Sequence, residues 1–172
     1  MKKLLLLFVA AGMTFLTGCE GPQGPAGPQG PAGSGEAEVF ELLAVDFAST
    51  GNGYQIYRTL NPNIFDSDNI LIYRLSGTID SNTPIWQLIP RTLFLPQGEL
   101  DYDFDFSRED FTIYAGGTYD LALTPQYIDN QTFRIVIIPG YFSRTTAPVD
   151  FNDYDAVIAA YGLAGKPVKR LN

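Results

Sequence analysis

The chain has 172 residues, of which 45% are hydrophobic and 17% charged, with 19 acidic side chains against 11 basic ones. This length suits one domain of ordinary size with appendages. With one cysteine and no histidine, the chain has no intramolecular disulfide, and most metal sites and histidine-dependent catalytic triads are excluded. The composition therefore leaves few classes of enzyme, and we expect a non-catalytic protein without a cofactor.

Residues 1–18 have the layout of a secretory signal peptide. Lys2 and Lys3 precede 13 mostly apolar residues that run from Leu4 to Leu16. A bilayer span needs about 20 apolar residues, whereas a basic start and a short apolar run are typical of an export signal. We therefore expect residues 1–18 to be cleaved, and export is predicted.

The predicted cleavage also changes the charge. Loss of the two lysines takes the formal net charge from −8 to −10, because no acid is removed with them. A surface this acidic repels nucleic acids and anionic headgroups. We therefore predict that the protein has no nucleic-acid partner.

The predicted signal peptide ends in Leu16, Thr17, Gly18 and Cys19. This stretch resembles the bacterial lipobox, in which small residues precede an invariant cysteine that is acylated after cleavage in front of it. The resemblance implies that acyl chains on Cys19 are the contact with the membrane; a chance cysteine beside an ordinary signal site is the alternative. Two or three chains suffice for stable attachment, since each buried methylene contributes about 0.8 kcal/mol.

Residues 19–35 carry a collagen-like pattern. From Gly21, glycine recurs at every third position five times, with proline after four of these glycines. Such repeats specify the collagen triple helix, but five triplets are too few for a free triple helix to be stable. We expect a single extended spacer spanning about 45 Å at 3.1 Å per residue and a monomeric domain. A trimer assembled with the help of the next domain is the alternative.

Residues 36–172 predict an all-β domain, an antiparallel β-sandwich of about eight strands with one C-terminal helix. The clearest strand is 101–106, where three aspartates alternate with three aromatic residues, so that one face is solvated and the other buried. Turn residues separate the short apolar runs, as is typical of antiparallel sandwiches. The other predicted strands are 39–47, 54–60, 70–76, 85–89, 92–95, 111–114, 118–123 and 132–138.

The sequence 150–162 predicts the helix. Acidic residues stand at its start and Gly162 at its end, which are the residues expected at helix termini. Phe151, Tyr154, Val157, Ile158 and Tyr161 fall on one stripe, so we expect this helix to pack on the sandwich, with docking on a partner as the alternative. Residues 166–172 are predicted to form a basic tail or an edge strand.

With its lipobox, Gly-Pro repeats and β-rich domain in this order, the chain resembles the collagen-like-repeat lipoproteins of Gram-negative bacteria. The resemblance implies a lipid-anchored protein of the cell envelope, on the outer membrane in preference to the inner one, with no established activity. The predicted function is adhesion, surface structure or protein contact. A carbohydrate-binding domain is the first alternative, and a carboxylate-dependent glycoside hydrolase the second.

Several carboxylates are candidates for chemistry. Asp101, Asp103 and Asp105 are weak candidates for a calcium site, because their side chains follow one another about 7 Å apart on one strand face; a solvated edge is the commoner meaning. The acidic loop 66–69 is a second calcium candidate, with a turn built by its own side chains as the alternative. Glu99, Glu109 and Asp110 are the candidates for glycoside hydrolysis, and residues 107–110 are expected to form a tight turn capped by Ser107.

Aromatic and basic residues provide the remaining candidates. A sugar-binding platform and a buried core are the two interpretations of the aromatic set, and most aromatics in a small sandwich belong to the core. Arginines within the apolar strands are expected to form cross-strand pairs with the acidic strand. The aromatic candidates are Tyr54, Tyr57, Tyr73, Trp86, Tyr119 and Tyr127, and the arginines are Arg58, Arg74, Arg91 and Arg134.

Overall fold

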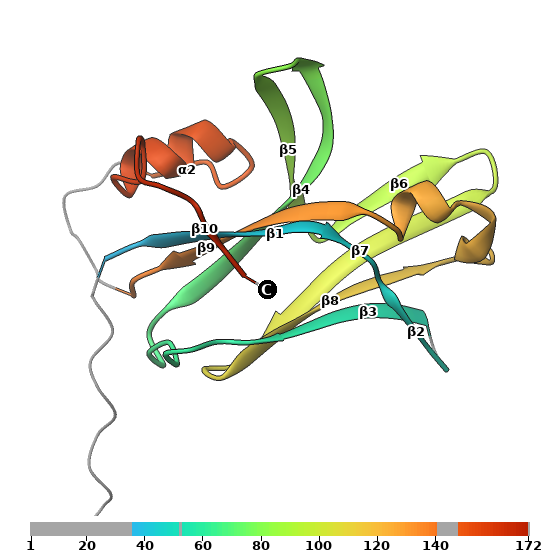
Figure 1. Ribbon diagram of the computed structural model, residues 1–172, viewed down its shortest axis with the longest axis horizontal. Helices are drawn as coiled ribbons and strands as arrows, with labels where there is room; N and C mark the ends of the chain where they lie inside the picture. The colour runs from blue at the N-terminus through green and yellow to red at the C-terminus, as the bar shows by residue number, and fades with distance from the viewer. Residues whose placement is uncertain (1–35, 52, 141–147, 172) are drawn as a thin grey trace, which may run out of the picture. The chain divides into compact units, whose positions relative to one another are not determined.

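The computed structural model describes residues 36–51, 53–140 and 148–171, all of which belong to one of the two units into which the chain divides, residues 31–172. The predicted signal peptide, the lipobox Leu16–Cys19 and the collagen-like spacer lie outside the described residues. The described part contains ten strands, two short 3₁₀-helices and one α-helix (Figure 1). The all-β class is thus confirmed, with two strands more than the eight expected.

The strands form two five-stranded sheets. Sheet A has the order β10 (Lys169–Arg170), β1 (Glu38–Val45), β9 (Gln131–Ile138), β4 (Asn69–Asp80) and β5 (Thr83–Ile89). Sheet B has the order β2 (Ala48–Thr50), β3 (Gly53–Thr59), β8 (Asp110–Gly117), β7 (Gly98–Phe106) and β6 (Arg91–Leu95). Neighbouring strands are antiparallel except β1 and β10, which are parallel.

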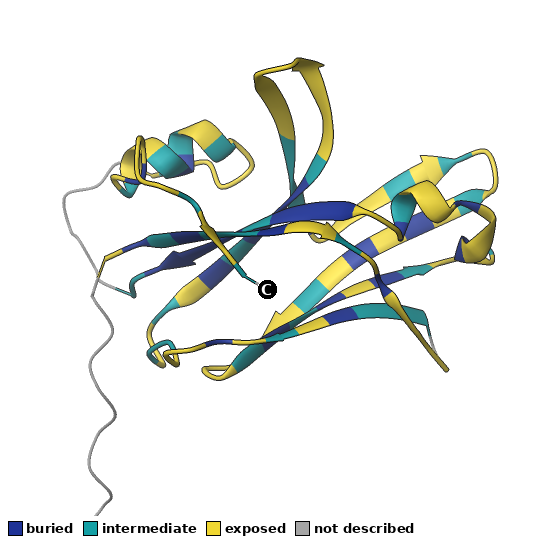
Figure 2. Cartoon of the chain, viewed as in Figure 1, coloured by how far each residue is buried: buried dark blue, intermediate teal, exposed yellow. Residues whose placement is uncertain are grey.

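The main hydrophobic core lies between the two sheets. Leu42, Ile72 and Phe133 from sheet A and Leu100 and Phe111 from sheet B are completely buried in it. The alternation predicted for 101–106 is present in β7, where Tyr102 faces this core while the aspartates face solvent. Figure 2 shows the resulting alternation of buried and exposed residues along the strands. Strands such as β7 are therefore stabilised by burying alternate side chains against this core.

The predicted strand 39–47 corresponds to β1, and the next strand, β2, belongs to the other sheet. β1 ends at Val45 in sheet A, and β2 begins at Ala48 in sheet B. A register irregularity lies between Leu42 and Val45, and there Ala44 has a positive φ of 55° while its N–H donates to Thr132 Oγ1. A bulge of this kind bends a strand, and after the bend the chain passes from sheet A to β2 in sheet B.

Helix α2 (Tyr154–Ala160) covers the outer face of sheet A. Val157 of the helix and Leu163 after it pack with Tyr73, Val136 and Ile138 in a second hydrophobic cluster. Strand β9 is therefore covered on both faces, by sheet B and by α2, which explains why seven of its eight residues are buried. The prediction that this helix packs on the sandwich is confirmed.

The helix is shorter than the predicted 150–162. Asp153 is the N-cap, because its side chain accepts a hydrogen bond from the Ala156 N–H. Before it, Asp150 Oδ1 accepts from the Asn152 N–H, which holds the chain in a turn. Phe151, predicted to lie on the buried stripe, is consequently 42% exposed. Gly162 ends the helix with a φ of 65°, as its sequence position predicts.

The predicted strand 118–123 is wrong. β8 continues to Gly117, and the chain then forms the 3₁₀-helices η1 (Leu121–Leu123) and η2 (Pro125–Tyr127). Asp120 accepts from the Ala122 N–H and so caps η1, while proline begins η2. Local capping here takes precedence over the apolar alternation. At the end of the chain, residues 169–170 form the edge strand β10 that was one of the two expectations.

The hairpin of β4 and β5 extends beyond the sandwich, on the same side of sheet A as α2 (Figure 1). Every residue from Ser76 to Ile85 is exposed, including Ile79, which is 75% exposed. Strand β4 has register irregularities after Leu75 and after Thr78, and bulges of this kind increase the local twist and bend the strand.

Candidate functional site

The acidic strand β7 does not form a metal site. Asp101, Asp103 and Asp105 are all exposed on the outer face of sheet B. Asp105 accepts a hydrogen bond of 2.9 Å from the Tyr114 hydroxyl, and Asp103 accepts one from the backbone of Phe104. Within the described residues, no group of three or more carboxylate, cysteine or histidine side chains could hold a metal ion.

The second calcium candidate, the loop 66–69, is a turn. Asp68 Oδ2 accepts from the Phe65 N–H, the Asp68 N–H donates to the Phe65 carbonyl, and Asp68 Oδ1 accepts from the Gly140 N–H. Asp66 contacts Arg108 at 3.4 Å. The carboxylate of Asp68 therefore organises the backbone of this loop, as the alternative interpretation expected.

Of the carboxylates proposed for glycoside hydrolysis, Glu99 is not brought together with the other two. Glu99 lies at the beginning of β7, whereas Glu109 and Asp110 lie beyond its other end, so about 20 Å of strand separates them at 3.3 Å per residue. Hydrolysis needs two carboxyl groups within about 10 Å. Asp110 accepts from the Ser107 and Tyr57 hydroxyls, and Ser107 caps the β7–β8 turn as predicted.

The six candidate aromatic residues do not form one platform. Tyr54, Tyr119 and Tyr127 pack against the main core, Tyr73 is fully buried beneath α2, and only Tyr57 is more than one-third exposed, at 49%. Trp86 packs on the other side of sheet A, among the residues that α2 covers. The core interpretation therefore holds for most of the set, and Trp86 requires separate treatment.

The arginines do not pair with the acidic strand as predicted. Arg74 and Arg134 belong to sheet A, and Arg58 lies on β3, which does not neighbour β7. Arg91 stands opposite Tyr102, on the inward-facing side of β7, so it points away from the aspartates. Arg74 is 7% exposed and donates to Gln131 Oε1, with its guanidinium 4.9 Å from the Tyr102 ring centroid.

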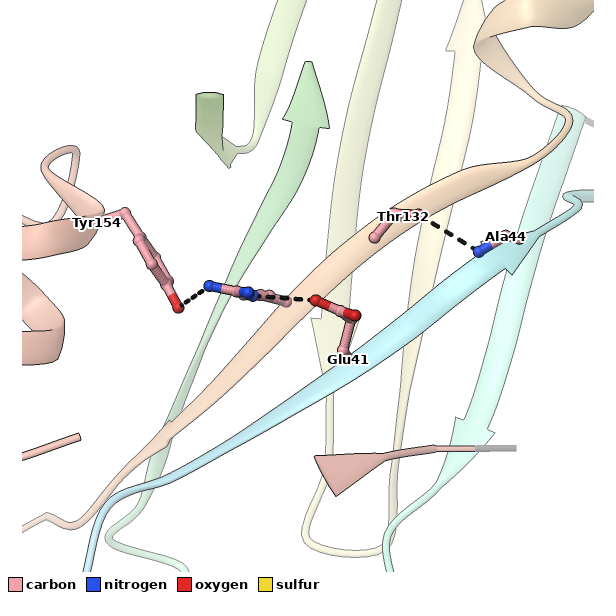
Figure 3. A network of polar contacts seen from close by, with 5 residues as sticks. Glu41, Ala44, Thr132 and Tyr154 are labelled. Carbon is pink, nitrogen blue, oxygen red and sulfur yellow. Dashed lines mark hydrogen bonds and ion pairs between the residues drawn. The ribbon is translucent and has the colours of Figure 1, made fainter. Parts of the chain in front are cut away.

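Arg134 on β9 is the centre of a network that joins three elements of the fold. Its Nε donates to Glu41 Oε2 on β1 at 3.1 Å, and its Nη1 donates to the Tyr154 hydroxyl on α2 at 2.6 Å. Figure 3 shows Glu41 and Tyr154 approaching from opposite sides. Because both charged side chains are about one-fifth exposed, this ion pair is less screened than a surface pair.

The Arg134 guanidinium also lies over an indole ring. Its central carbon is 4.3 Å from the Trp86 ring centroid and 5.3 Å from that of Tyr154. Trp86 is on β5, and β4 lies between β5 and β9, so the arginine side chain crosses one strand to reach it. A cation–π contact is stronger when the cation is desolvated. The contact with Arg134 holds the indole ring of Trp86 in one orientation.

Burial and charge act on Tyr154 in opposite directions. Burial raises the pKa of its phenol above the ordinary value, and the neighbouring Arg134 guanidinium partly offsets this effect. Both effects act on the same hydroxyl that accepts the hydrogen bond from the Arg134 N–H. The Trp86 Nε1, in contrast, is buried and has no hydrogen-bond partner within the described residues.

An open groove of about 710 Å³ adjoins this network, and we call it the hairpin groove. One wall is the tip of the β4–β5 hairpin, and the other is the turn that leads into α2. Trp86, Arg134 and Tyr154 contribute to its lining between these walls. The remaining lining residues are Ile79, Asn82, Thr83, Pro84 and Ile85 from the hairpin, and Asp150, Asn152, Asp153 and Asp155 from the turn and helix.

The sequence identified only part of this groove. Trp86 was a candidate as an aromatic residue, and Arg134 was a candidate for a different pairing. Tyr154 was assigned to the buried stripe of the helix, and Asn82, Asn152 and Glu41 were not singled out. The only available signal was the amphipathic helix, which predicts that Tyr154 docks on the sheet without indicating where.

Comparisons with known protein families, with curated proteins and with solved structures give no match for this chain. None of the helices in the described part of the chain combines the length and hydrophobicity that a membrane span requires.

Proposed function

We propose that the chain is an exported lipoprotein of the bacterial cell envelope, which displays a non-catalytic β-sandwich domain for adhesion, surface structure or contact with other proteins. The order of its parts carries the proposal. The lipobox at residues 16–19 is followed by the Gly-Pro spacer, and the first strand of the folded domain begins at Glu38. A lipid anchor, a spacer and a compact domain in this order suit display at a distance from a membrane.

Two further features support the proposal. The mature charge of −10 keeps an acidic domain away from anionic headgroups, so the acyl chains on Cys19 would be its contact with the membrane. The length of β7 between Glu99 and the pair of Glu109 and Asp110 counts against the hydrolase alternative. We therefore favour a binding or structural role on the outer membrane.

Cell fractionation of wild type and a Cys19→Ser variant tests this proposal. The wild-type protein is expected to sediment with the outer-membrane fraction and to be released from it only by detergent. The variant is expected to leave the outer-membrane fraction, because it has no acylation site. Recovery of both proteins in the same soluble fraction would contradict the proposal.

Carbohydrate binding is the second candidate function, and the hairpin groove favours it. The groove combines a tryptophan and a tyrosine with carboxylate and amide side chains. Aromatic faces and convergent polar groups are the usual components of small-molecule sites. Binding of surface glycans would also be a means of adhesion, so this candidate is compatible with the display function.

A further inference from the structure

We propose that the hairpin groove binds a neutral oligosaccharide, with the sugar packed against Trp86 and hydrogen-bonded by side chains from the two walls. This inference rests on the carbohydrate-binding candidate above and adds the ligand class and the residues that select it. It is independent of the lipid anchor, since every residue in the groove lies between positions 79 and 155.

The shape of the groove suits an extended ligand. Its volume of about 710 Å³ lies within the range of about 300–1,000 Å³ that is usual for ligand sites. The space is an open groove between a hairpin and a helix, so a chain of sugar units can extend out of either end. A short oligosaccharide segment fits such a site better than a compact metabolite, which would be buried more completely in a closed pocket.

The aromatic part of the groove is rigid before any ligand arrives. Trp86 is held by the Arg134 guanidinium, and Arg134 is held in turn by Glu41 and Tyr154. Trp86 and Tyr154 also contact each other, with ring centroids 5.6 Å apart. Arg134 already covers the indole ring at 4.3 Å, so the apolar C–H face of a pyranose ring would contact those parts of Trp86 and Tyr154 that line the groove. Rigid side chains lose little conformational entropy on binding.

The polar walls supply hydrogen-bonding groups of the kind that sugar hydroxyls need. Asn82 and Thr83 on the hairpin and Asn152 and Asp155 on the other wall line the groove, and all four residues are exposed. Thr83 Oγ1 donates to Asp80 and Asn152 Nδ2 donates to Asp150, which leaves their oxygen atoms as acceptors. Carboxylates accept hydrogen bonds from hydroxyl groups, whereas amides both accept and donate. Bonds in which one partner is charged are the stronger ones. A ligand with many hydroxyl groups can therefore form hydrogen bonds with side chains of both walls at once.

The charge of the lining selects against acidic ligands. Asp150, Asp153 and Asp155 lie on one wall, and the single cation in the lining, Arg134, is already paired with Glu41 at 3.1 Å. The electrostatic potential in the groove is therefore negative. Phosphorylated or carboxylated sugars would be repelled, which leaves neutral sugars as the matching class.

The inference can be tested by fluorescence, because Trp86 is the only tryptophan in the chain. The full chain is purified in a detergent without a sugar headgroup and titrated with hexamers of neutral hexoses and N-acetylhexosamines. A galacturonic acid hexamer serves as the acidic probe. We expect at least one neutral hexamer to change the Trp86 emission with saturation below about 1 mM, and the acidic hexamer to have no effect.

Variants on the two walls locate the site. Asn82→Ala and Asp155→Ala change exposed side chains on opposite walls, and each is expected to weaken binding roughly tenfold. Tyr57→Ala and Asp103→Ala are the matched controls, because they change an exposed aromatic and an exposed acid on the outer face of sheet B. Both controls are expected to bind as the wild type does.

Three results would overturn the inference. These are no response to any neutral hexamer at about 1 mM, equal binding of the acidic hexamer, and binding that survives both wall variants but is lost in Tyr57→Ala. A Cys19→Ser chain is expected to bind sugar normally, so failure of lipid anchoring and failure of sugar binding give different results.

Discussion

Arg134 forms several interactions that a lysine could not reproduce. Its Nε and Nη1 donate in different directions, to Glu41 and to Tyr154, while the planar group stacks on Trp86. An ammonium group has no such planar fork. We expect Arg134→Lys to lower the free energy of unfolding by about 2 kcal/mol, since Glu41 loses a well-placed partner in a largely buried position.

Urea denaturation measures this effect, and Arg108→Lys is its matched control. Arg108 pairs with Asp66 at 3.4 Å, but the two side chains are 55% and 83% exposed. An exposed pair contributes about 0.5 kcal/mol, so the control is expected to change the urea midpoint only slightly. Equal losses in the two variants would show that the Arg134 network contributes nothing beyond a surface ion pair.

The buried tyrosines predict a loss of stability at high pH. Burial raises the pKa of Tyr102 to about 12 from the ordinary value of 10.0, although Arg74 acts in the opposite direction. Below pH 10 the phenol is protonated in both states. Between pH 10 and 12 the unfolded chain releases this proton while the folded protein retains it, so stability falls by up to about 3 kcal/mol.

The check compares urea midpoints at pH 9 and pH 11.5 for wild type and Tyr102→Phe. The variant has no phenol at position 102 to ionise and is expected to lose less stability over this range. At pH 9 it should already be less stable by about 1 kcal/mol, because the Tyr102 hydroxyl donates to the Tyr127 carbonyl at 2.7 Å. An identical pH dependence in the two proteins would be evidence against this account of Tyr102.

Two adjacent glycines at the end of β8 differ in how much space they have. A methyl group on Gly117 would lie 2.5 Å from the Glu99 carbonyl oxygen and 3.1 Å from Leu121, whereas one on Gly116 would meet nothing within 4 Å. We expect Gly117→Ala to cost about 2 kcal/mol, because backbone on β7 must move. Gly116→Ala should be neutral or slightly stabilising. Thermal denaturation of the pair measures the difference, and equal melting temperatures would contradict it.

Strands and helix were predictable where the signal is local. Two short patterns determine the structure of their own segment: the alternation of Asp and aromatic residues in β7, and the capping residues around α2. The prediction failed at 118–123 because Asp120 forms a local cap that competes with strand pairing. It also did not indicate the irregularity at Ala44 or the short strand β2 that follows β1 in the other sheet.

The candidate site was less predictable than the strands because it is assembled over long distances in the sequence. Arg134 is 93 positions from Glu41 and 20 positions from Tyr154, and Trp86 approaches from a third strand. Which strands become neighbours depends on the packing of the whole domain, and an amphipathic pattern does not encode it. The sequence therefore suggested aromatic and basic candidates but paired them incorrectly.

For the whole molecule, we predict a monomer with a single extended spacer. Five glycine triplets, four of them Gly-Pro, supply little association energy, and the charge of −10 expected after signal cleavage sets like surfaces against each other. Sedimentation of a lipid-free chain from Glu20 to Asn172 is expected to give the mass of one chain. A mass of three chains, with triple-helical dichroism that is lost in Gly27→Ala, would show instead that the spacer assembles trimers.

The account depends most on the lipid anchor, because display of the domain at a membrane follows from it. Mass spectrometry of the protein purified from bacterial membranes tests the anchor directly. We predict a mature N-terminus at Cys19 that carries two or three acyl chains, and an uncleaved or miscleaved signal peptide in a Cys19→Ala variant. A wild-type protein with an unmodified N-terminus, or with residues 1–18 retained, would contradict the account.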